Sequence, residues 1–342
     1  MNCLLCVPRI VFAVTTIAAA VAQQPLPPTP GVAPSAPAAT AVSQPSESST
    51  TGHRVLLQGK DRLAIVARDG SVEWEMPWGG IHDLHRLANG HVLCQRGAAA
   101  VVEIDPESKS VVWSYDSSKR NGNDGRRVEV HSFVPLADGR LWIAESGPAR
   151  VIEIDRDGTL RAAMPLTVAH GDPHRDTRLV RRLASGNALV CHEGDGCVRE
   201  YEFPGGRVVF EFAVPLFDRP RADGHGPEAF GNQVFGALRL PNGDTLVATG
   251  NGHSVLEVDG KGQIVWRLDQ KDLPGIVLAW VTTLEVLANG NYVIGNCHAG
   301  PGQPVLVEIE PRSKKLIWRL DAHEQFGNSV SNTLLLDAQS LR

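Results

Sequence analysis

Histidines are the residues of this chain whose positions point most clearly to chemistry. The sequence contains 12 histidines, and nine of them fall in two kinds of loop within a repeated unit. An imidazole can exchange a proton near neutral pH, attack an electrophile or bind a metal ion. The candidate catalytic residues are His131, His174, His192, His225 and His298.

Other polar side chains in the same loops would bind a substrate beside these imidazoles. The candidate substrate-binding residues are His82, Arg127, Glu129, Glu145, Arg178, Glu193, Glu228, Asn232, Asn251, His253, Trp280, Thr282 and Asn296. Taken singly, such residues more often stabilise turns. Together in one concave site they predict a binding site for a small-molecule ligand. No residue is assigned as a metal ligand, because the chain lacks an HExxH-type motif, and the cofactor stays unknown.

A turn that recurs along the sequence indicates that these loops connect the β-strands of a repeated unit. The segment His82–Asp116 contains four short apolar runs separated by turns, which is typical of antiparallel hairpins. Its turn Leu87–Gly90 recurs at residues 136–139, 183–186, 240–243 and 287–290, with a degenerate copy at 336–339. The steps between copies are 49, 47, 57, 47 and 49 residues, close to the period of about 40–50 residues of propeller blades.

The two ends of the repeated region complete the same architecture. His53–Met76 contains only the last three strands of a unit, and Ser331–Ala338 supplies only a first strand. A shared blade would close a ring and remove exposed strand edges. We therefore predict an all-β, six-bladed β-propeller of four-stranded antiparallel blades. An aromatic residue on the last strand of most units is expected to pack between blades: Trp74, Trp113, Phe210, Trp266 and Trp318.

The N-terminal segment predicts export. Residues 1–22 end in the apolar run Ile10–Ala22, which is too short to cross a membrane and is typical of a signal peptide. Residues 23–52 are rich in Pro, Ala, Ser and Thr and are expected to form a disordered tether, followed by the propeller at 53–342. We expect a secreted or periplasmic protein with no transmembrane segment in the mature chain.

The charge, the cysteines and the long loops each give a further prediction. The formal net charge is −5 and no basic stripe is present, so nucleic acid is not an expected partner. Cys191 and Cys197 bracket a loop between neighbouring strands, and we predict a disulfide there; the alternative is two separate buried thiols. The long loops 116–130 and 215–234 are expected to be walls or lids of a pocket.

Two motifs carry a resemblance to known propellers. The run Val102–Asp105 followed by Trp113 resembles the repeats of pyrroloquinoline-quinone-like propellers, and the pattern returns at Glu310 with Trp318. The segment His82–Gly90 resembles the corresponding segment of arylsulfotransferase-like propellers. That second resemblance implies a histidine near the axis as transient sulfuryl acceptor, with other polar residues around the sulfate. The quinone-dependent dehydrogenases have eight blades and adjacent cysteines, whereas this chain has neither, so the quinone is not an expected cofactor.

Three functions follow as hypotheses. The first is an exported enzyme or binder of a small ligand, with group transfer or hydrolysis in an axial funnel where Arg127 or Arg178 would stabilise sulfate oxygens. The second is a metal-dependent propeller enzyme whose histidines converge only in the folded chain. The third is a non-catalytic scaffold that binds a protein partner in the cell envelope.

Overall fold

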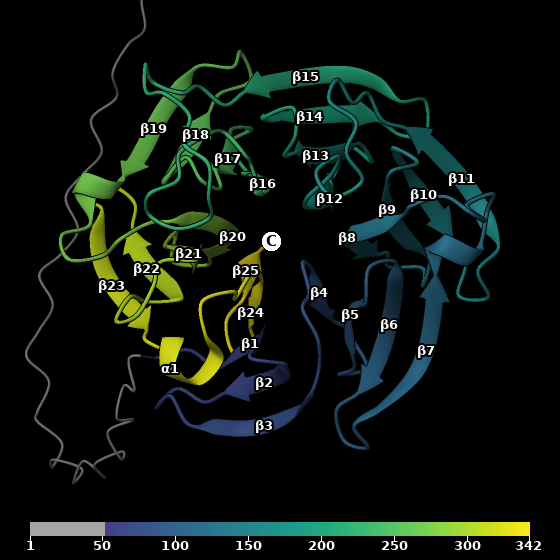
Figure 1. Cartoon of the computed structure of the whole chain (residues 1–342), viewed down its shortest axis with the longest axis horizontal. Coiled ribbons are helices and arrows are strands. Elements are labelled where there is room, and N and C mark those ends of the chain that lie inside the picture. Colours follow the sequence, from purple (N-terminus) through teal and green to yellow (C-terminus); the bar gives the residue numbers. More distant parts are fainter. Residues whose placement is uncertain (1–51) are drawn as a thin grey trace, which may run out of the picture. The chain divides into compact units, whose positions relative to one another are not determined.

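The computed structural model describes residues 52–342, which form six β-sheets around a central axis (Figure 1). The predicted six-bladed, all-β propeller is confirmed. Helix in the described residues is limited to α1 (His323–Phe326) and two short 3₁₀ segments, and none of it is long and apolar enough to cross a membrane. The predicted signal peptide, and all of the predicted tether except residue 52, lie outside the described residues.

Each blade contains four antiparallel strands, numbered here from the axis outward. Blade 1 consists of β24 (Thr333–Leu335), β1 (Val55–Gly59), β2 (Arg62–Val66) and β3 (Val72–Pro77). Blade 2 consists of β4 (Leu84–Arg86), β5 (Val92–Arg96), β6 (Ala100–Asp105) and β7 (Ser110–Asp116). Blade 3 consists of β8 (Glu129–Pro135), β9 (Leu141–Ser146), β10 (Arg150–Ile154) and β11 (Leu160–Pro165).

The other three blades repeat this order. Blade 4 consists of β12 (Val180–Arg182), β13 (Ala188–His192), β14 (Cys197–Glu202) and β15 (Arg207–Ala213). Blade 5 consists of β16 (Gly236–Arg239), β17 (Thr245–Ala248), β18 (Ser254–Val258) and β19 (Ile264–Asp269). Blade 6 consists of β20 (Trp280–Leu287), β21 (Tyr292–Cys297), β22 (Leu306–Glu310) and β23 (Lys315–Leu320), with β25 (Ser340–Leu341) added beside β20.

The ring is closed as the sequence predicts. Strand β24 pairs with β1, and Leu335 lies opposite Val55 while Thr333 lies opposite Leu57. The chain therefore joins its C-terminal strand to its first three strands in one sheet, and this pairing completes the four-stranded blade 1. The short strand β25, which the sequence did not predict, then pairs with β20 of the neighbouring blade.

The repeated Leu-x-x-Gly turns link the first and second strands of blades 2 to 6. In the first copy, the Gly90 amide donates to the Leu87 carbonyl and the Leu87 amide donates to the His91 carbonyl. Gly90 has φ of 86°, a conformation that glycine adopts without steric cost. The Asn89 side chain accepts a hydrogen bond from the His91 amide, which fixes the hairpin register.

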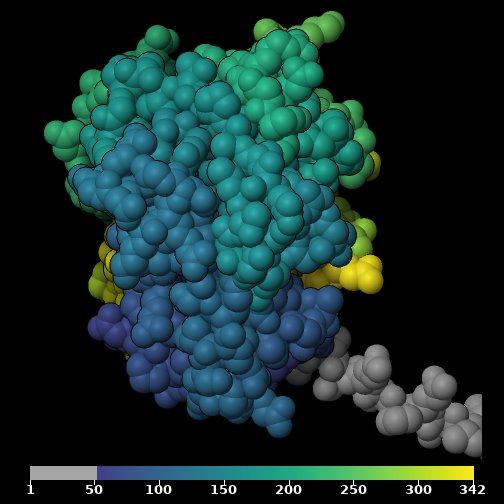
Figure 2. Space-filling view, turned by 90° about the vertical axis from the view of Figure 1, so that its right-hand side faces the viewer, coloured from purple at the N-terminus to yellow at the C-terminus, as the bar shows by residue number. Residues whose placement is uncertain are grey.

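Aromatic side chains on the outer strands join neighbouring blades, as predicted. The indole N–H groups of Trp74, Trp113 and Trp266 donate to backbone carbonyls of Pro106, Arg156 and Pro311, each in the next blade, at 2.8, 2.6 and 2.9 Å. These contacts cover the apolar layer between adjacent sheets, where large aromatic surfaces contribute most to stability. Figure 2 shows the resulting continuous outer wall on the side of blades 2 and 3, coloured blue to teal.

The predicted disulfide is wrong. Cys94, Cys191, Cys197 and Cys297 are buried free thiols in the described part of the chain. Cys191 lies opposite Val198 and Cys197 lies opposite His192 in the β13–β14 pair. Residues at odd and even positions of a strand point to opposite faces of a sheet, so the two sulfur atoms are on different faces. The alternative of two separate buried thiols is the observed one.

The innermost strands meet around a buried ion pair. Asp83 precedes β4 and binds Arg181 of β12, with Oδ2 at 3.0 Å from Nη1 and Oδ1 at 3.3 Å from Nη2. Ser132 of β8 and Asn332 donate to the same carboxylate. This network connects four blades and also positions the site above it, because Asn332 donates to the backbone carbonyl of His82.

Candidate functional site

Two adjoining cavities lie where the loops leading into the innermost strands meet. The larger has a volume of about 540 Å³ and the smaller about 370 Å³. They share His82, Cys297, His298 and Ser331 in their linings. We call the two cavities together the axial mouth. All six blades contribute to it, from Ser331 before blade 1 to Trp280 in blade 6.

Eleven of the residues selected from the sequence line the axial mouth. The larger cavity contains His82, His174, Arg178, Glu193, His225, Asn251, Trp280, Thr282 and His298, and the smaller adds Glu129 and His131. These residues are distant in sequence, and the radial arrangement of the sheets brings them together. Four of the five candidate catalytic histidines are in this group.

The selected residues that do not line the mouth include three buried groups that hold loops in place. His192 is fully buried; its Nδ1 donates to the Asp176 carbonyl and its Nε2 lies 2.8 Å from the Tyr201 hydroxyl. His253 contacts backbone carbonyls of Leu278 and Ala229 through both ring nitrogens. Asn296 holds the backbone before β20 through its amide group.

Four further selected residues lie outside the cavity lining. Glu145 is buried and pairs with Arg150 at 2.6 Å. Arg127 is exposed and donates to the Glu129 carboxylate. Glu228 is exposed and accepts from the Gly226 amide, while Asn232 accepts from Arg221.

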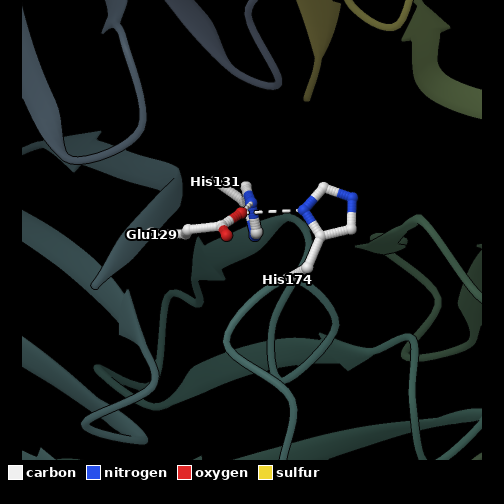
Figure 3. A group of neighbouring side chains, drawn as sticks. All are labelled: Glu129, His131 and His174. Carbon is white, nitrogen blue, oxygen red and sulfur yellow. Dashed lines mark hydrogen bonds and ion pairs between the residues drawn. The ribbon is translucent and has the colours of Figure 1, made fainter. Parts of the chain in front are cut away.

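Glu129, His131 and His174 form the most compact group of titratable side chains in the described residues of the mouth (Figure 3). Their nearest ligand atoms all lie within 4.8 Å of one another. Glu129 Oε2 lies 3.1 Å from His131 Nε2 and 2.7 Å from His174 Nδ1. One carboxylate and two imidazoles in this arrangement can relay protons or bind a divalent metal ion.

A β-bulge aims His131 into the mouth. In the β8–β9 pair, Val130 lies opposite Glu145 and Ser132 lies opposite Ala144, so His131 is the extra residue. Bulges change the direction of a side chain and are common beside active sites. His131 Nδ1 lies 2.9 Å from the Thr177 carbonyl. Because that carbonyl only accepts, Nδ1 donates to it and Nε2 faces Glu129.

The charges of this group are set by burial and hydrogen bonds. Burial lowers the pKa of His131 to about 4, against the raising effect of Glu129. The adjacent side chains of His131 and His174 hold the pKa of Glu129 well below its usual range. At neutral pH the group therefore contains an ionised carboxylate beside a neutral, buried imidazole.

The loop that carries His174 is held in one conformation by two aspartates. Asp172 accepts from the His174 amide at 2.9 Å, and Asp176 accepts from the Asp172 amide at 2.6 Å. Asp176 also accepts from the Gly147 amide of blade 3 at 2.8 Å. His174 is half-exposed, but its backbone is fixed.

His82 lies directly beside this group. Its ring centroid is 4.6 Å from that of His131 and 6.2 Å from that of His174. Its buried Nδ1 has no hydrogen-bond partner among the described residues. Burial, followed by the charges of His131 and Arg178, lowers the pKa of His82 well below its ordinary value. His82 is therefore a neutral imidazole whose Nδ1 has no hydrogen-bond partner among the described residues.

A buried cation faces the larger cavity. Arg178 is only 4% exposed and forms an ion pair with Glu193, which is equally buried. Its Nη1 is buried and has no partner among the described residues, although Arg178 lines the cavity. An unsatisfied guanidinium N–H beside a cavity is suited to an anionic ligand group, since leaving it unpaired is unfavourable.

The opposite wall combines stacked rings with the long loop 215–234. His225 stacks on Trp280 with centroids 5.0 Å apart, and His298 lies 5.3 Å from His225. The loop adds Arg221 and Asp223 to the lining, which agrees with its predicted role as a wall. The other long loop, 116–130, reaches the mouth only at Glu129, so most of it does not serve as a wall.

Sequence reasoning missed part of the lining. Phe230 and Phe235 form an apolar floor, and Arg175, Arg221 and Asp223 add charge at the rim. The length of loop 215–234 was the available signal for Arg221 and Asp223. No pattern separates the two phenylalanines from ordinary core residues.

Comparisons with known proteins agree with this architecture. Residues 59–259, more than half of the chain, match the family described as outer membrane protein assembly factor BamB. No curated protein matches the chain. Among solved structures, a protein of unknown function from Bacteroides caccae is 23% identical with a TM-score of 0.68, covering 85% of this chain and 99% of that one.

Two lyase structures share the fold at lower identity. A streptogramin B lyase is 10% identical with a TM-score of 0.52 and covers 79% of this chain and 83% of that one. A catalytically inactive histidine-to-alanine variant of virginiamycin B lyase from Staphylococcus aureus, with quinupristin, is 11% identical with a TM-score of 0.52, covering 81% and 87%. These likenesses show the propeller fold.

Proposed function

The chain belongs to the BamB family of pyrroloquinoline-quinone-like propellers, and on this premise we propose that its axial mouth binds a small anionic substrate and catalyses group transfer or hydrolysis on it. The observation that carries the proposal is the buried guanidinium of Arg178, which lines the larger cavity with an unpartnered Nη1. It lies in the same cavity as the imidazoles of His174, His225 and His298.

These groups suit esters of sulfate or phosphate. Arg178 would bind the oxygens of the anionic group and stabilise the charge that develops on them. In hydrolysis, one imidazole takes a proton from water as the water oxygen bonds to sulfur or phosphorus, and the ester bond to the alcohol breaks. A second, protonated imidazole returns a proton to the leaving alcohol. In transfer, an imidazole nitrogen would first bond to sulfur as the ester bond breaks and the alcohol leaves with a proton, as the arylsulfotransferase resemblance implies; the oxygen of an acceptor alcohol would then bond to sulfur, lose its proton and release the imidazole.

Turnover of 4-nitrophenyl sulfate and 4-nitrophenyl phosphate, with and without phenol as acceptor, tests this function. The double variant Arg178→Gln with Glu193→Gln removes the cation without leaving a buried charge unpaired. Its kcat/KM is expected to fall at least about 100-fold. The matched control replaces the partly buried pair Arg239 and Glu200, which lies outside the mouth, in the same way.

Two results would count against the proposal. One is equal turnover in the Arg178 double variant and the control. The other is a wild-type protein that turns over neither ester and is not stabilised by sulfate or phosphate in a thermal unfolding scan.

Export is part of the same proposal. Residues 1–22 would direct the chain out of the cytoplasm and be removed, and the propeller would act in the periplasm or outside the cell. Mass spectrometry of protein from the extracellular and periplasmic fractions is expected to give a mature N-terminus at Gln23. A chain that retains residues 1–22 in the cytoplasmic fraction would contradict this.

A second candidate function is a scaffold in the cell envelope, favoured by the family description itself. A scaffold would bind its partner through exposed apolar side chains, and the described residues include several of these. Val112, Val209, Val265 and Ile317 lie on the outer strands of four different blades. Crosslinking in intact cells would identify a specific envelope partner if this function holds, and the Arg178 double variant would retain it.

A further inference from the structure

We propose that Glu129, His131 and His174 bind one divalent transition metal ion in the axial mouth. The three side chains come from two segments of the chain 43 to 45 residues apart, and their ligand atoms lie within 4.8 Å of one another. Figure 3 shows the rings of His131 and His174 beside the carboxylate of Glu129.

The spacing of the ligand atoms fits a common coordination sphere. Bonds of about 2.0–2.2 Å to zinc place neighbouring ligands roughly 3.0–3.5 Å apart. Glu129 Oε2 is 3.1 Å from His131 Nε2 and 2.7 Å from His174 Nδ1, so these two pairs are close to that spacing. The two ring nitrogens lie within 4.8 Å of each other, and rotation of the half-exposed His174 side chain would bring them to the same spacing.

Hydrogen bonding around the three residues leaves their ligand atoms directed inward. The Thr177 carbonyl accepts from His131 Nδ1, which fixes the tautomer whose Nε2 presents a lone pair to Glu129. Arg127 donates to Glu129 Oε1 at 2.6 Å and leaves Oε2 for the two rings. Glu129 Oε2 and His131 Nε2 then lie 3.1 Å apart, a separation that two ligands of one ion can have.

Supporting contacts keep this arrangement rigid. The Thr177 amide donates to Ser146 Oγ at 3.1 Å, which anchors the carbonyl that orients His131. Asp172 holds the backbone of His174. A hydrogen bond from the second ring nitrogen to a backbone carbonyl, as in His131, is typical of metal-binding histidines.

The ligand set indicates the class of metal. Two imidazoles and one carboxylate suit zinc, iron, cobalt or manganese, whereas calcium prefers six to eight oxygen ligands. Three protein ligands leave positions open, which is typical of catalytic rather than structural sites. The open side faces solvent and the cavities, since His174 is half-exposed and lines the larger one.

The ion would also match the proposed substrate. One carboxylate against a divalent cation leaves a net positive charge in the mouth, near Arg178. The role of the ion in the reaction rests on the proposed function, because it would polarise an anionic group or an attacking water. Binding of the ion does not depend on the proposed function, and it is measured in the absence of any substrate.

The test uses cobalt and zinc alone as probes of the purified, chelator-treated chain. Titration with Co²⁺ is followed by visible absorption, and displacement by Zn²⁺ by calorimetry. We expect one ion per chain. His174→Ala and Glu129→Gln are each expected to weaken binding at least about 100-fold, more than the loss of a supporting contact. His170→Ala is the matched control, an exposed histidine on the same loop, and should bind normally.

Several outcomes separate the two proposals. Absence of saturable Co²⁺ binding by the wild type, or equal binding by wild type and His174→Ala, would overturn the metal site. The exposed position of His174 means that its replacement should leave the fold intact, which circular dichroism checks. Metal binding without turnover of either ester would overturn the proposed function alone, and turnover in protein that binds no metal would overturn this inference alone.

Discussion

Replacing Asp83 by asparagine is expected to destabilise the whole propeller. Asp83 is fully buried and binds Arg181, Ser132 and Asn332 from three other blades. Asparagine keeps the shape and part of the hydrogen bonding but removes the charge. Arg181, itself only 7% exposed, would then hold an uncompensated cation at the axis.

The size of the effect follows from the burial of the pair. Removing one partner of a buried ion pair costs about 3–5 kcal/mol. A domain of this size has an unfolding entropy of about 0.6 kcal/mol/K, so Tm should fall by about 5–8 °C. Asp138→Asn at an exposed ion pair is the control, and its Tm should stay close to that of the wild type.

A double-mutant cycle isolates the interaction. Arg181→Met alone leaves Asp83 unpaired, whereas Asp83→Asn with Arg181→Met removes both charges, so the double variant should be more stable than Asp83→Asn alone. Thermal unfolding of the four proteins at pH 7.5, followed by calorimetry, gives the coupling energy. Additive effects, or a Tm for Asp83→Asn within 1 °C of wild type, would refute this account of the axis.

The same residue predicts a pH dependence. Burial alone would raise the pKa of Asp83, but the charges of Arg181 and His85 hold it well below its usual range. The carboxylate therefore contributes stability that is present above the unfolded-state pKa of about 3.9 and is lost as pH falls toward the lower folded value. The Tm difference between wild type and Asp83→Asn should shrink in acid.

Three further predictions test other contacts. Burial lowers the pKa of His192 to about 4, so stability should fall as pH drops from about 6.5 to 4, and His192→Gln should flatten that slope in thermal melts. Trp113→Ala should cost about 3–5 kcal/mol in urea unfolding through the lost blade contact, whereas Val112→Ala on the same strand should cost under about 0.5 kcal/mol. Gly250→Ala should lower Tm far more than Gly243→Ala, since an added Cβ would meet the Gln233 carbonyl at 1.9 Å in the first case and open space in the second; equal shifts would contradict this.

The fold was predictable because its signals are local and repeated. The hydrogen bonds of the Asn-Gly turn at Asn89 are all formed between residues 87 and 91. The recurrence of this turn indicates the number of blades. Trp74 and Trp113 follow the same logic, since each recurs at one position of the unit and contacts the next blade. The spacing of these residues along the chain is therefore enough to predict the blades and the contacts between them.

The site was predictable only to the level of loops. His131 and His192 were assigned to loops of the two predicted classes, but they lie in strands β8 and β13, where a bulge aims His131 into the mouth and Tyr201 contacts the buried His192. The residues next to each histidine in the sequence predict neither the bulge nor the backbone carbonyl that the ring contacts. The disulfide prediction failed for a similar reason, because strand register, not loop length, decides which face Cys197 occupies.

Buried histidines also hold the walls of the mouth in place. His131 and His253 each place Nδ1 against a backbone carbonyl in the loop that leads into the next blade, at Thr177 and Leu278, and His192 does so at Asp176 in the loop that leads into its own blade. One ring therefore fixes the loop that carries another functional group, as His192 does beside Arg178. A ring of such contacts holds the lining in place before a ligand arrives, which lowers the entropy lost on binding. Imidazole suits this role since a neutral, buried ring still provides one donor for a carbonyl. The abundance of histidine at one end of the propeller thus has two physical causes, the chemistry of the mouth and the rigidity of its walls.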